Sequence, residues 1–454
     1  MKTAWALGAL LLAVLAAFGP ILGHGFVFDD FALIVENAGV HGLDRARLAW
    51  MFATTWLTTY MPLGWASFAA VHAAAGLSPA AYHAANLGAH WLVCAALFAA
   101  ARRLLRAGGH PRPEESAFLA ALLFAVHPFQ ANTVAWAIEL PDMLSTLFFL
   151  LAIFVYLGGT SRARVAGVFA LYLVSLLFRW KSLSLPAVLV GLDYWPLGRL
   201  RARPGDPFDR ARVWVWAEKA PFAVLAVAAA SLTMLAKSRE AYAAAFEPGA
   251  AARALWLYAG LLFSPGGYRA AYGLHGAGAG AWLALAGAGA LTAWLWARRR
   301  ERPWALLAWT AYAAAVLPPA LSSQNGAVYV YLAYGYLGVL GLFVLAGSAA
   351  RTPRAWAAVS ALSLGLIILS RREIRHWSGQ VAFWSAAVER DPGFSPARGE
   401  LGAALLAEGR AAEALPHLEA RLADAPSDAL AAARKKKPPG RSPGRLRSSA
   451  DGAR

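Results

Sequence analysis

The sequence has few charged residues and a single cysteine, and each shortage excludes a class of protein. Asp, Glu, Lys and Arg make up 15% of the 454 residues, against about 25% in soluble domains, which is too little charge to cover a soluble surface. The lone Cys94 excludes an internal disulfide framework and a cysteine-based zinc site. A hydrophobic content of 59% and a mean hydropathy of +0.48 exclude disorder, collagen and coiled coil. The composition predicts an all-α, polytopic transmembrane helical bundle.

Acidic residues are the scarcer sign of charge, at 25 against 42 basic residues, which gives a formal net charge of +17. A balance of this size is typical of nucleic-acid-binding proteins. Here the basic residues lie in short clusters between apolar runs, which is the pattern of cytoplasmic loops under the positive-inside rule. We therefore predict no nucleic acid among the partners. The clusters are Arg102, Arg103, Arg106 and Arg112; Arg162 and Arg164; Arg199, Arg201 and Arg203; and Arg298, Arg299, Arg300 and Arg302.

The apolar runs predict about eleven membrane-spanning helices, since a span needs about 20 apolar residues. The first, Trp5–Leu22, is interpreted as a spanning helix rather than a cleaved signal peptide. A cytoplasmic N-terminus then places every basic cluster inside, and the first outer loop 23–80 and the C-terminal region outside. The segments 62–76 and 250–264 are interpreted as interfacial or re-entrant helices. The other candidate spans are 81–101, 116–129, 140–158, 165–179, 183–197, 220–237, 279–297, 303–320, 328–347 and 355–370.

After the predicted transmembrane domain 1–370, the composition becomes soluble and helical. Within 371–430, pairs such as Leu401-Gly402 and Glu413-Ala414 resemble a tetratricopeptide repeat, in which small residues let two antiparallel helices pack. About three repeats are usually needed to bury their faces, so this unit either leans on the membrane domain or another chain, or is truncated. Residues 431–454 are rich in basic residues, Pro and Gly, and predict a disordered basic tail. The tail is expected to be solvated, with contact to anionic membrane lipids as the alternative.

Two adjacent carboxylates, Asp29 and Asp30, follow the first predicted span. A carboxylate at mid-membrane costs on the order of 2.5–3.5 kcal/mol, and at the membrane edge the pair is either a solvated helix end or a functional group. In the functional interpretation, one carboxylate is a general base for an acceptor hydroxyl, and the other orients it or holds a divalent metal. A bare Asp-Asp leaves both interpretations open.

Three polar residues of the next predicted span, His83, Asn86 and His90, have the spacing i, i+3 and i+7 and share one helix face. Polar side chains on a spanning helix usually face the bundle interior. We expect them to hydrogen-bond between helices or to line a cavity. A histidine-based metal site is less favoured, because no carboxylates accompany them at matching spacing.

Further cavity candidates follow Pro128, which predicts a helix break directly after His127. A break near the membrane surface is tolerated where it lines a cavity. Glu139 and Asp142 come shortly after the break and are, with His127, candidates to line such a cavity.

Two basic residues, Arg179 and Lys181, fall at the outer end of their predicted helix, against the positive-inside rule. A lipid phosphate, bound by the guanidinium fork and the ammonium group, is one explanation. Snorkelling toward ordinary lipid headgroups is the other.

Taken in order, these stretches resemble the polytopic GT-C glycosyltransferases with C-terminal tetratricopeptide repeats, the bacterial relatives of the TMTC-type protein O-mannosyltransferases. The resemblance runs from about Gly23 to Pro426. It is carried by Phe28-Asp29-Asp30, Tyr82-His83 with Asn86 and His90, Leu123 to Trp136, and Leu185-Pro186 with Asp193-Tyr194-Trp195-Pro196-Leu197.

The resemblance implies the transfer of a mannose-like sugar from a polyprenyl-phosphate donor to an acceptor protein or glycan, on the outer face of a bacterial plasma (inner) membrane. It implies that Asp29, or its neighbour Asp30, is the catalytic base in the first outer loop. Arg179 falls where the family tends to carry a Lys, and suits the stabilisation of the leaving phosphate.

The chain also departs from the family pattern at two places. Relatives often show Gly-Arg-x-Asp where this chain has Glu139-Leu140-Pro141-Asp142, and Asp-Arg-Tyr-x-Tyr where it has Ala327-Val328-Tyr329-Val330-Tyr331. These losses of charge are consistent with altered specificity, a different phosphate clamp, or lost activity. The alternative function is therefore a non-catalytic membrane scaffold or assembly protein that binds other proteins through its repeat.

Overall fold

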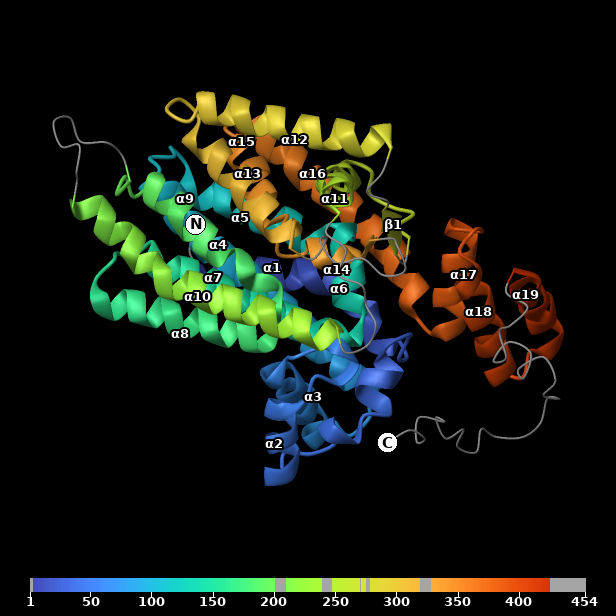
Figure 1. Cartoon of the computed structure of the whole chain (residues 1–454). Coiled ribbons are helices and arrows are strands. Elements are labelled where there is room, and N and C mark those ends of the chain that lie inside the picture. The colour runs from blue at the N-terminus through green and yellow to red at the C-terminus, as the bar shows by residue number, and fades with distance from the viewer. Residues whose placement is uncertain are drawn as a thin grey trace. The chain divides into compact units, whose positions relative to one another are not determined.

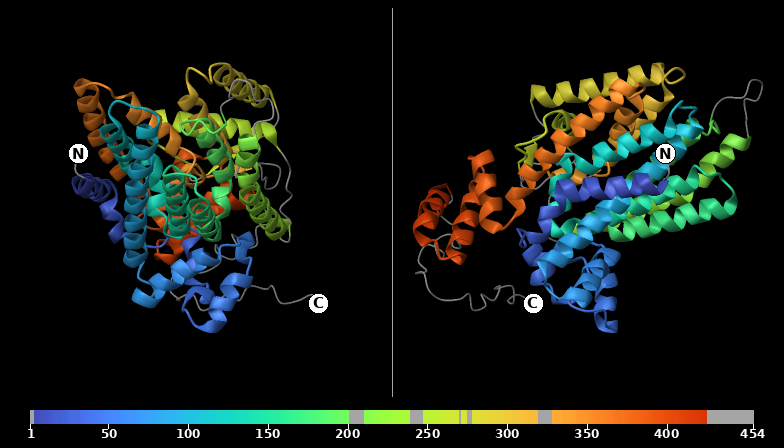
Figure 2. Two further views of the ribbon diagram at one scale, coloured as in Figure 1. Left: turned by 90° about the vertical axis from the view of Figure 1, so that its left-hand side faces the viewer. Right: turned by 180° about the vertical axis from the view of Figure 1, so that it is seen from behind.

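The computed structural model describes residues 3–200, 210–238, 247–269, 271–274, 278–318 and 328–424. The chain divides into two compact units, Met1–Ser378 and Gly379–Arg454. The first is a bundle of long helices that run in broadly the same direction (Figures 1 and 2). Its strands among the described residues are the short β1 (Tyr272–Leu274) and β2 (Val328–Val330), which pair antiparallel.

Six segments of the described chain are helical, long and apolar enough to cross a membrane, and a seventh joins them if one bent pair counts as a span. The protein is therefore a multi-pass membrane protein. The remaining spans predicted from the sequence that lie in the described residues correspond to shorter helices or, at 328–347, to an interrupted segment. The six are Thr3–Gly23 (α1 Thr3–Phe18 with η1 Gly19–Gly23), α4 (Pro79–Ala107), Ala137–Tyr156 (η6 Ala137–Glu139 with α7 Leu140–Tyr156), Arg212–Ala236 within α10 (Arg210–Ser238), α12 (Ala279–Ala297), and Pro353–Trp377 (α16 Pro353–Ile374 with η9 Arg375–Trp377). The shorter helices are α8 (Arg162–Phe178), α9 (Leu185–Tyr194), α13 (Pro303–Val316) and α15 (Leu340–Ala349). The segment 250–264, predicted to be an interfacial or re-entrant helix, forms the helix α11 (Pro248–Phe263).

The bent pair confirms the predicted break at Pro128. Helix α5 (Pro113–Val126) ends one residue before His127, and η5 (Pro128–Gln130) and α6 (Ala131–Ala135) continue at a bend of 52°. Proline has no main-chain N–H to continue the helix. The His127 Nδ1 atom accepts a hydrogen bond from the Phe129 N–H, at 3.1 Å, which satisfies a donor that the break would otherwise leave unpaired.

The segment 328–347 differs from the single span predicted for it. It forms β2, the one-turn helix α14 (Leu332–Gly335) and then α15. The chain turns closely past other side chains: a Cβ atom on Gly335 would lie 2.7 Å from Phe129 Cζ, and one on Gly338 would lie 2.9 Å from Val316 Cγ2. The apolar composition therefore reflects packing inside the bundle rather than one continuous helix through the membrane.

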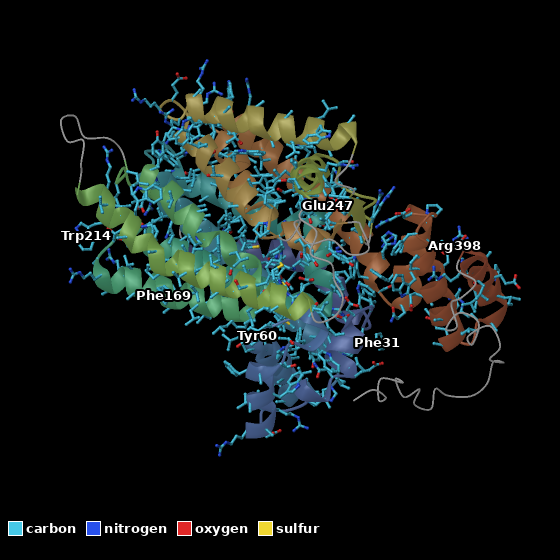
Figure 3. The ribbon with its side chains drawn as sticks, viewed as in Figure 1. Phe31, Tyr60, Phe169, Trp214, Glu247 and Arg398 are labelled. Carbon is cyan, nitrogen blue, oxygen red and sulfur yellow. The ribbon has the colours of Figure 1, made fainter. Side chains whose placement is uncertain are left out.

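Small and hydroxylated residues bring the helices together, as is usual in membranes. A Cβ atom on Gly347 of α15 would lie 2.5 Å from the Ser116 carbonyl oxygen of α5. Between α7 and α8, the Ser145 hydroxyl donates to the Ser175 carbonyl at 2.9 Å, and the Ser175 hydroxyl donates to the Ser145 carbonyl at 2.7 Å. By contrast, Trp214 on α10 is 74% exposed and projects from the outer side of the bundle (Figure 3), as expected of a lipid-facing side chain.

The two ends of the bundle differ in what they carry. The loop after α1 folds at one end into η2 (Phe31–Val35), η3 (Ala38–Val40), α2 (Arg45–Ala53), η4 (Trp56–Thr58) and α3 (Pro62–Ala75), drawn in blue in Figure 1. The N-terminus and the turn between α12 and α13, with its arginines, lie at the opposite end. The segment 62–76, predicted to be an interfacial or re-entrant helix, is helical over 14 residues.

The second unit contains α17 (Gln380–Arg390), α18 (Ser395–Ala407) and α19 (Ala411–Asp424). Helices α18 and α19 pack closely, because a Cβ atom on Gly402 would lie 2.6 Å from Leu418 Cγ. This is the role predicted for the small residues of the repeat-like segment, and the assignment to tetratricopeptide repeats stays a prediction. The predicted tail 431–454 lies outside the described residues.

Candidate functional site

Six of the ten predicted site residues come together where the loop after α1 meets the bundle. They lie on the segments 27–30, 136–142 and 179–184, and residues 331–334 complete the surroundings. Helices α7 and α8 form a hairpin through a short turn at 157–161, so the start of α7 and the end of α8 lie at the same end of the bundle. Phe31 and Tyr60, labelled in Figure 3, mark the part of the loop nearest to this end. We call Asp29, Asp30, Glu139, Asp142, Arg179 and Lys181 the acidic cluster.

Asp30 is fully buried and holds two loops together. Its Oδ2 atom accepts a hydrogen bond from the Val27 N–H at 2.9 Å, and its Oδ1 atom accepts one from the Ile138 N–H at 3.0 Å. Burial nevertheless raises the pKa of Asp30 to about 8, with the main-chain donors acting in the opposite direction. Both carboxyl oxygens are occupied, so Asp30 is suited to positioning its neighbour.

Asp29 differs from Asp30 in being partly exposed. Burial raises the pKa of Asp29 to about 6, and the positive charge of Arg179 limits this rise. The residue before it, Phe28, has a φ of +49°, a left-handed conformation that is rare for a bulky side chain. Its ring stacks on Trp136, with 5.6 Å between the ring centroids. A carboxylate with a pKa near neutrality, beside a strained residue, suits proton transfer.

Arg179 and Lys181 are both paired with buried carboxylates of the segment at the start of α7. The Arg179 Nε atom lies 3.1 Å from Asp142 Oδ2, and the Lys181 Nζ atom lies 2.8 Å from Asp142 Oδ1 and 3.7 Å from Glu139 Oε2. Asp142 is in the first turn of α7, where the helix dipole favours a negative charge. Arg179 and Lys181, which the predicted orientation leaves as unexplained outward charges, therefore have partners inside the protein.

The two cations differ in how many of their donors are engaged. Lys181 is buried, and its ammonium group also lies 4.4 Å from the ring centroid of Tyr334. The Arg179 Nε atom lies 3.1 Å from Asp142 Oδ2 in an ion pair without hydrogen-bond alignment, and the Nη1 atom contacts the Met61 sulfur at 2.7 Å. A thioether is a weak acceptor, so the guanidinium fork of Arg179 can turn these donors to a phosphate.

The other four predicted site residues bond mainly to main-chain groups outside the acidic cluster. His83 Nε2 lies 3.4 Å from the Gly25 carbonyl, and Asn86 Nδ2 donates to the Val134 and Trp136 carbonyls at 3.2 and 2.8 Å. These bonds fix the loop after α1 and the segment before α7 onto α4.

His90 and His127 sit deeper in the bundle. His90 Nδ1 lies 2.7 Å from the Tyr336 hydroxyl and Nε2 lies 3.2 Å from the Ala125 carbonyl, while His127 Nε2 lies 3.2 Å from the Leu262 carbonyl. Among the described residues, no group of three or more His, Cys, Asp or Glu is arranged to hold a metal ion.

Sequence reasoning did not find Tyr334 or the contact of Met61 with Arg179. Tyr334 lies in an apolar run that was interpreted as a span, where an aromatic residue gives no separate signal. With Asp142, Ser145 and Lys181 it lines a cavity of about 10 Å³, close to the space that one water molecule needs.

Comparison with known proteins supports the family resemblance for part of the chain. No family model matches it. It is 30% identical over 158 residues to protein O-mannosyl-transferase TMTC3 of Mus musculus, and the match covers 32% of this chain and 16% of that protein. It is 32% identical over 164 residues to TMTC1 of Homo sapiens (34% and 18%), and 30% identical over 188 residues to human TMTC2 (40% and 20%). Each match therefore spans a fifth or less of the relative's length.

One solved structure is similar to this chain over most of its length. It is a crystal structure of ArnT from Cupriavidus metallidurans bound to undecaprenyl phosphate, with 15% sequence identity and a TM-score of 0.45. The similarity covers 96% of this chain and 76% of that one.

Proposed function

We propose that this protein is a membrane glycosyltransferase that moves a sugar from a polyprenyl-phosphate donor to the hydroxyl group of an acceptor protein or glycan. The observation that carries the proposal is Asp29, a partly exposed carboxylate whose pKa is raised by burial and lowered by the positive charge of Arg179. A base beside a phosphate-binding cation is what a displacement at a sugar phosphate needs. The similarity to TMTC O-mannosyltransferases over about a third of the chain supports this reaction class and makes mannose the first donor sugar to try.

The reaction is a single inverting displacement. The acceptor hydroxyl gives its proton to Asp29 while its oxygen bonds to the anomeric carbon. The bond from that carbon to the donor phosphate oxygen breaks, and its electron pair leaves on the phosphate. Negative charge therefore moves from the acceptor side to the phosphate side, where the fixed positive charge of Arg179 stabilises it.

Within this mechanism the two aspartates have different roles. Asp30 positions Asp29 by bonding to the main chain on both sides of the site. Arg179 is the donor-phosphate ligand, because its Nη1 atom contacts a thioether sulfur, which is a weak acceptor that a phosphate oxygen would replace. Lys181 offsets the negative charges of Glu139 and Asp142, the carboxylate that also pairs with Arg179.

The membrane orientation follows from the charges of the loops. The arginine clusters within the described residues lie at the end opposite to the acidic cluster, and such clusters resist export. We infer that the acidic cluster faces the outer side of a bacterial plasma membrane and the N-terminus faces the cytoplasm. In that orientation the acceptor meets Asp29 outside the cell.

The test is sugar transfer by membranes that contain the full chain, with polyprenyl-phosphate mannose as donor. The double variant Asp29→Asn/Asp30→Asn should abolish transfer while the protein still reaches the membrane in normal amounts. Glu36→Gln, an exposed carboxylate in the same loop, is the matched control and should transfer normally. Transfer by the double variant at the native rate would refute the assigned base.

Mass spectrometry of outer-face glycoproteins and glycans, from cells with and without the gene, identifies the acceptor. A glycan that disappears with the gene and returns with the native chain, but not with the double variant, supports the proposal. If no glycan changes and no donor is consumed, a non-catalytic scaffold is the better account.

A further inference from the structure

A cavity of about 680 Å³ lies in the half of the bundle that carries the basic loops, away from the acidic cluster. It is bounded by α4, α7, α9, α13 and α15. Its walls are mostly aliphatic, with Leu97, Ile153, Leu192, Leu307 and Val344 among the lining side chains. Pockets of 300–1,000 Å³ are typical of sites that hold a small molecule.

The polar residues of the lining gather at one end of the cavity. His110 and Arg351 belong to two loops at the basic end of the bundle, and Ser348 is the last polar residue of α15 before them. His110 connects its loop to the end of α15, because its Nδ1 accepts from the Arg112 N–H at 3.2 Å and its Nε2 therefore donates to the Ser348 carbonyl at 3.1 Å. Arg351 is exposed and lines this end of the cavity, which we call its mouth.

The mouth has the features of a membrane interface. Trp195 and Trp304 line it, and tryptophan is enriched where lipid headgroups begin. Arg112 lies beside it, with its guanidinium carbon 5.3 Å from the ring centroid of Trp356. The surroundings of the mouth are therefore positively charged and aromatic.

The opposite end of the cavity is apolar. Phe149 and Leu337 form it, and Leu337 also lines the small cavity beside Lys181 and Asp142. Leu337 thus stands between the two spaces. The polarity of the large cavity runs from charged at the basic loops to purely apolar at mid-bundle.

A space with this lining is unsuited to water and costly to leave empty. Water in a cavity needs two to four polar partners, which the apolar walls do not offer. The free-energy cost of an unfilled cavity grows with its volume. A flexible hydrocarbon chain satisfies both conditions, and the bilayer supplies one.

We propose that this cavity binds a hydrocarbon chain of an anionic phospholipid from the leaflet at the basic end, with the lipid phosphate against Arg351. Charge decides the headgroup, because the mouth offers arginine and the loops around it carry further arginines. Direction decides against the polyprenyl donor, whose phosphate would have to lie at the apolar end for its sugar to reach Asp29. The exclusion of the polyprenyl donor rests on the proposed function, whereas the assignment of a lipid chain to the cavity does not.

Native mass spectrometry of the full chain in detergent tests the proposal. After delipidation, the protein is incubated separately with phosphatidylglycerol, phosphatidylcholine and undecaprenyl phosphate. The native protein should retain one phosphatidylglycerol in preference to the other two lipids. Arg351→Gln should weaken that retention on the order of tenfold, as expected for the loss of a charge-assisted hydrogen bond.

Two matched pairs separate headgroup from chain. Arg354→Gln removes an exposed arginine that does not line the cavity and should leave retention unchanged, unlike Arg351→Gln. Ala311→Phe places a ring in the cavity and should abolish retention and raise the melting temperature of the lipid-free protein, whereas Ala314→Phe, on the same helix but outside the lining, should not abolish retention.

Three outcomes would overturn the proposal. Retention of phosphatidylcholine equal to that of phosphatidylglycerol would contradict the proposed preference for an anionic headgroup. Retention that survives Ala311→Phe would place the lipid elsewhere on the protein. Preferred retention of undecaprenyl phosphate that Ala311→Phe abolishes would assign the cavity to the donor's tail.

Discussion

Two buried ion clusters, one toward each end of the bundle, differ in whether their charges balance. The closed network joins α7, α9 and α10 toward the basic end and consists of Tyr156, Asp193, Arg199, Glu218 and Lys219. Arg199 Nη1 and Lys219 Nζ lie 2.9 and 2.7 Å from the two Asp193 oxygens. The same two cations lie 2.8 and 2.7 Å from the Glu218 oxygens, and the Tyr156 hydroxyl donates to Asp193 at 2.7 Å. Two carboxylates and two cations match one for one.

In the acidic cluster, four carboxyl groups face Arg179 and Lys181, and the charges do not match. Asp29 is only partly buried, and the Arg179 Nη1 atom contacts the Met61 sulfur, a weak acceptor. A closed set of buried charges fixes helices in place, because losing any member leaves another unpaired. An open set costs stability and is retained where charge must move. The comparison predicts that substitutions in the acidic cluster change activity more than stability, and that those in the closed network do the reverse.

The largest effect is expected from Asp29→Asn. Asn cannot accept the proton of the acceptor hydroxyl, and loss of a general base lowers a rate by about 10²–10⁴-fold. Single-turnover transfer from polyprenyl-phosphate mannose measures this directly. The melting temperature in detergent should stay within a few degrees of the native value. If Asp29→Asn unfolds instead, Asp29 has a structural role like that of the closed network, and the predicted difference between the two clusters is wrong.

The closed network should respond in the opposite way. Asp193→Ala leaves Arg199 and Lys219 without their buried partner, and breaking a buried pair costs about 3–5 kcal/mol. Thermal unfolding should show the loss, while transfer per folded molecule stays near the native rate. Asp44→Asn removes half of an exposed pair with Arg47 and is the control, with little change in either measurement. Equal effects of the two variants would contradict the assignment.

Within the acidic cluster, Arg179→Gln and Lys181→Gln should differ in their effects on transfer and on thermal stability. Arg179→Gln removes a charge-assisted contact to the donor phosphate, and transfer should fall about 10- to 100-fold while Lys181 still pairs with Asp142. Lys181→Gln leaves Glu139 and Asp142 without their buried ammonium group and should lower the melting temperature more than Arg179→Gln does. If the two variants cannot be told apart by activity and stability, Arg179 has no separate role.

The smallest effect is in the pH dependence of transfer. Asp29 acts as a base only when ionised, and its pKa is raised by burial to about 6. Transfer should therefore rise with pH through about 6 and level off above 7, with roughly a tenfold loss for each unit below the midpoint. Arg179 lowers the pKa of Asp29, so Arg179→Gln should move the midpoint to higher pH. If the midpoint of the pH profile does not change in Arg179→Gln, the charge of Arg179 does not act on Asp29.

The sequence located most helices but not their number as spans. Hydrophobic runs and Pro128 predicted α4, α7, α12 and the break after α5, because apolarity and proline act locally. The run 328–347 misled, because a segment buried among other helices is as apolar as one that faces lipid. Only the tertiary structure shows that this segment pairs with β1 and turns past Phe129.

The candidate site was predicted as a set of residues rather than as an arrangement. The order of motifs pointed to Asp29, Asp30, Arg179 and Lys181. It could not separate Asp29 from Asp30, because the main-chain donors that occupy Asp30 come from Val27 and, 108 positions away, Ile138. Nor could spacing alone show that His83 and Asn86 would bond to main-chain carbonyls outside the acidic cluster.

The sequence by itself determined that this is a membrane protein, where most of its helices run, and which loops carry the positive charge. Those properties follow from the transfer of each segment between water and lipid, which depends on local composition. The tertiary structure decided which carboxylates are paired with cations and which are partly exposed, because burial and pairing depend on segments that meet only after folding. The scarcity of acidic residues becomes meaningful at that level, where Asp29 is partly exposed and Asp193 is enclosed by cations.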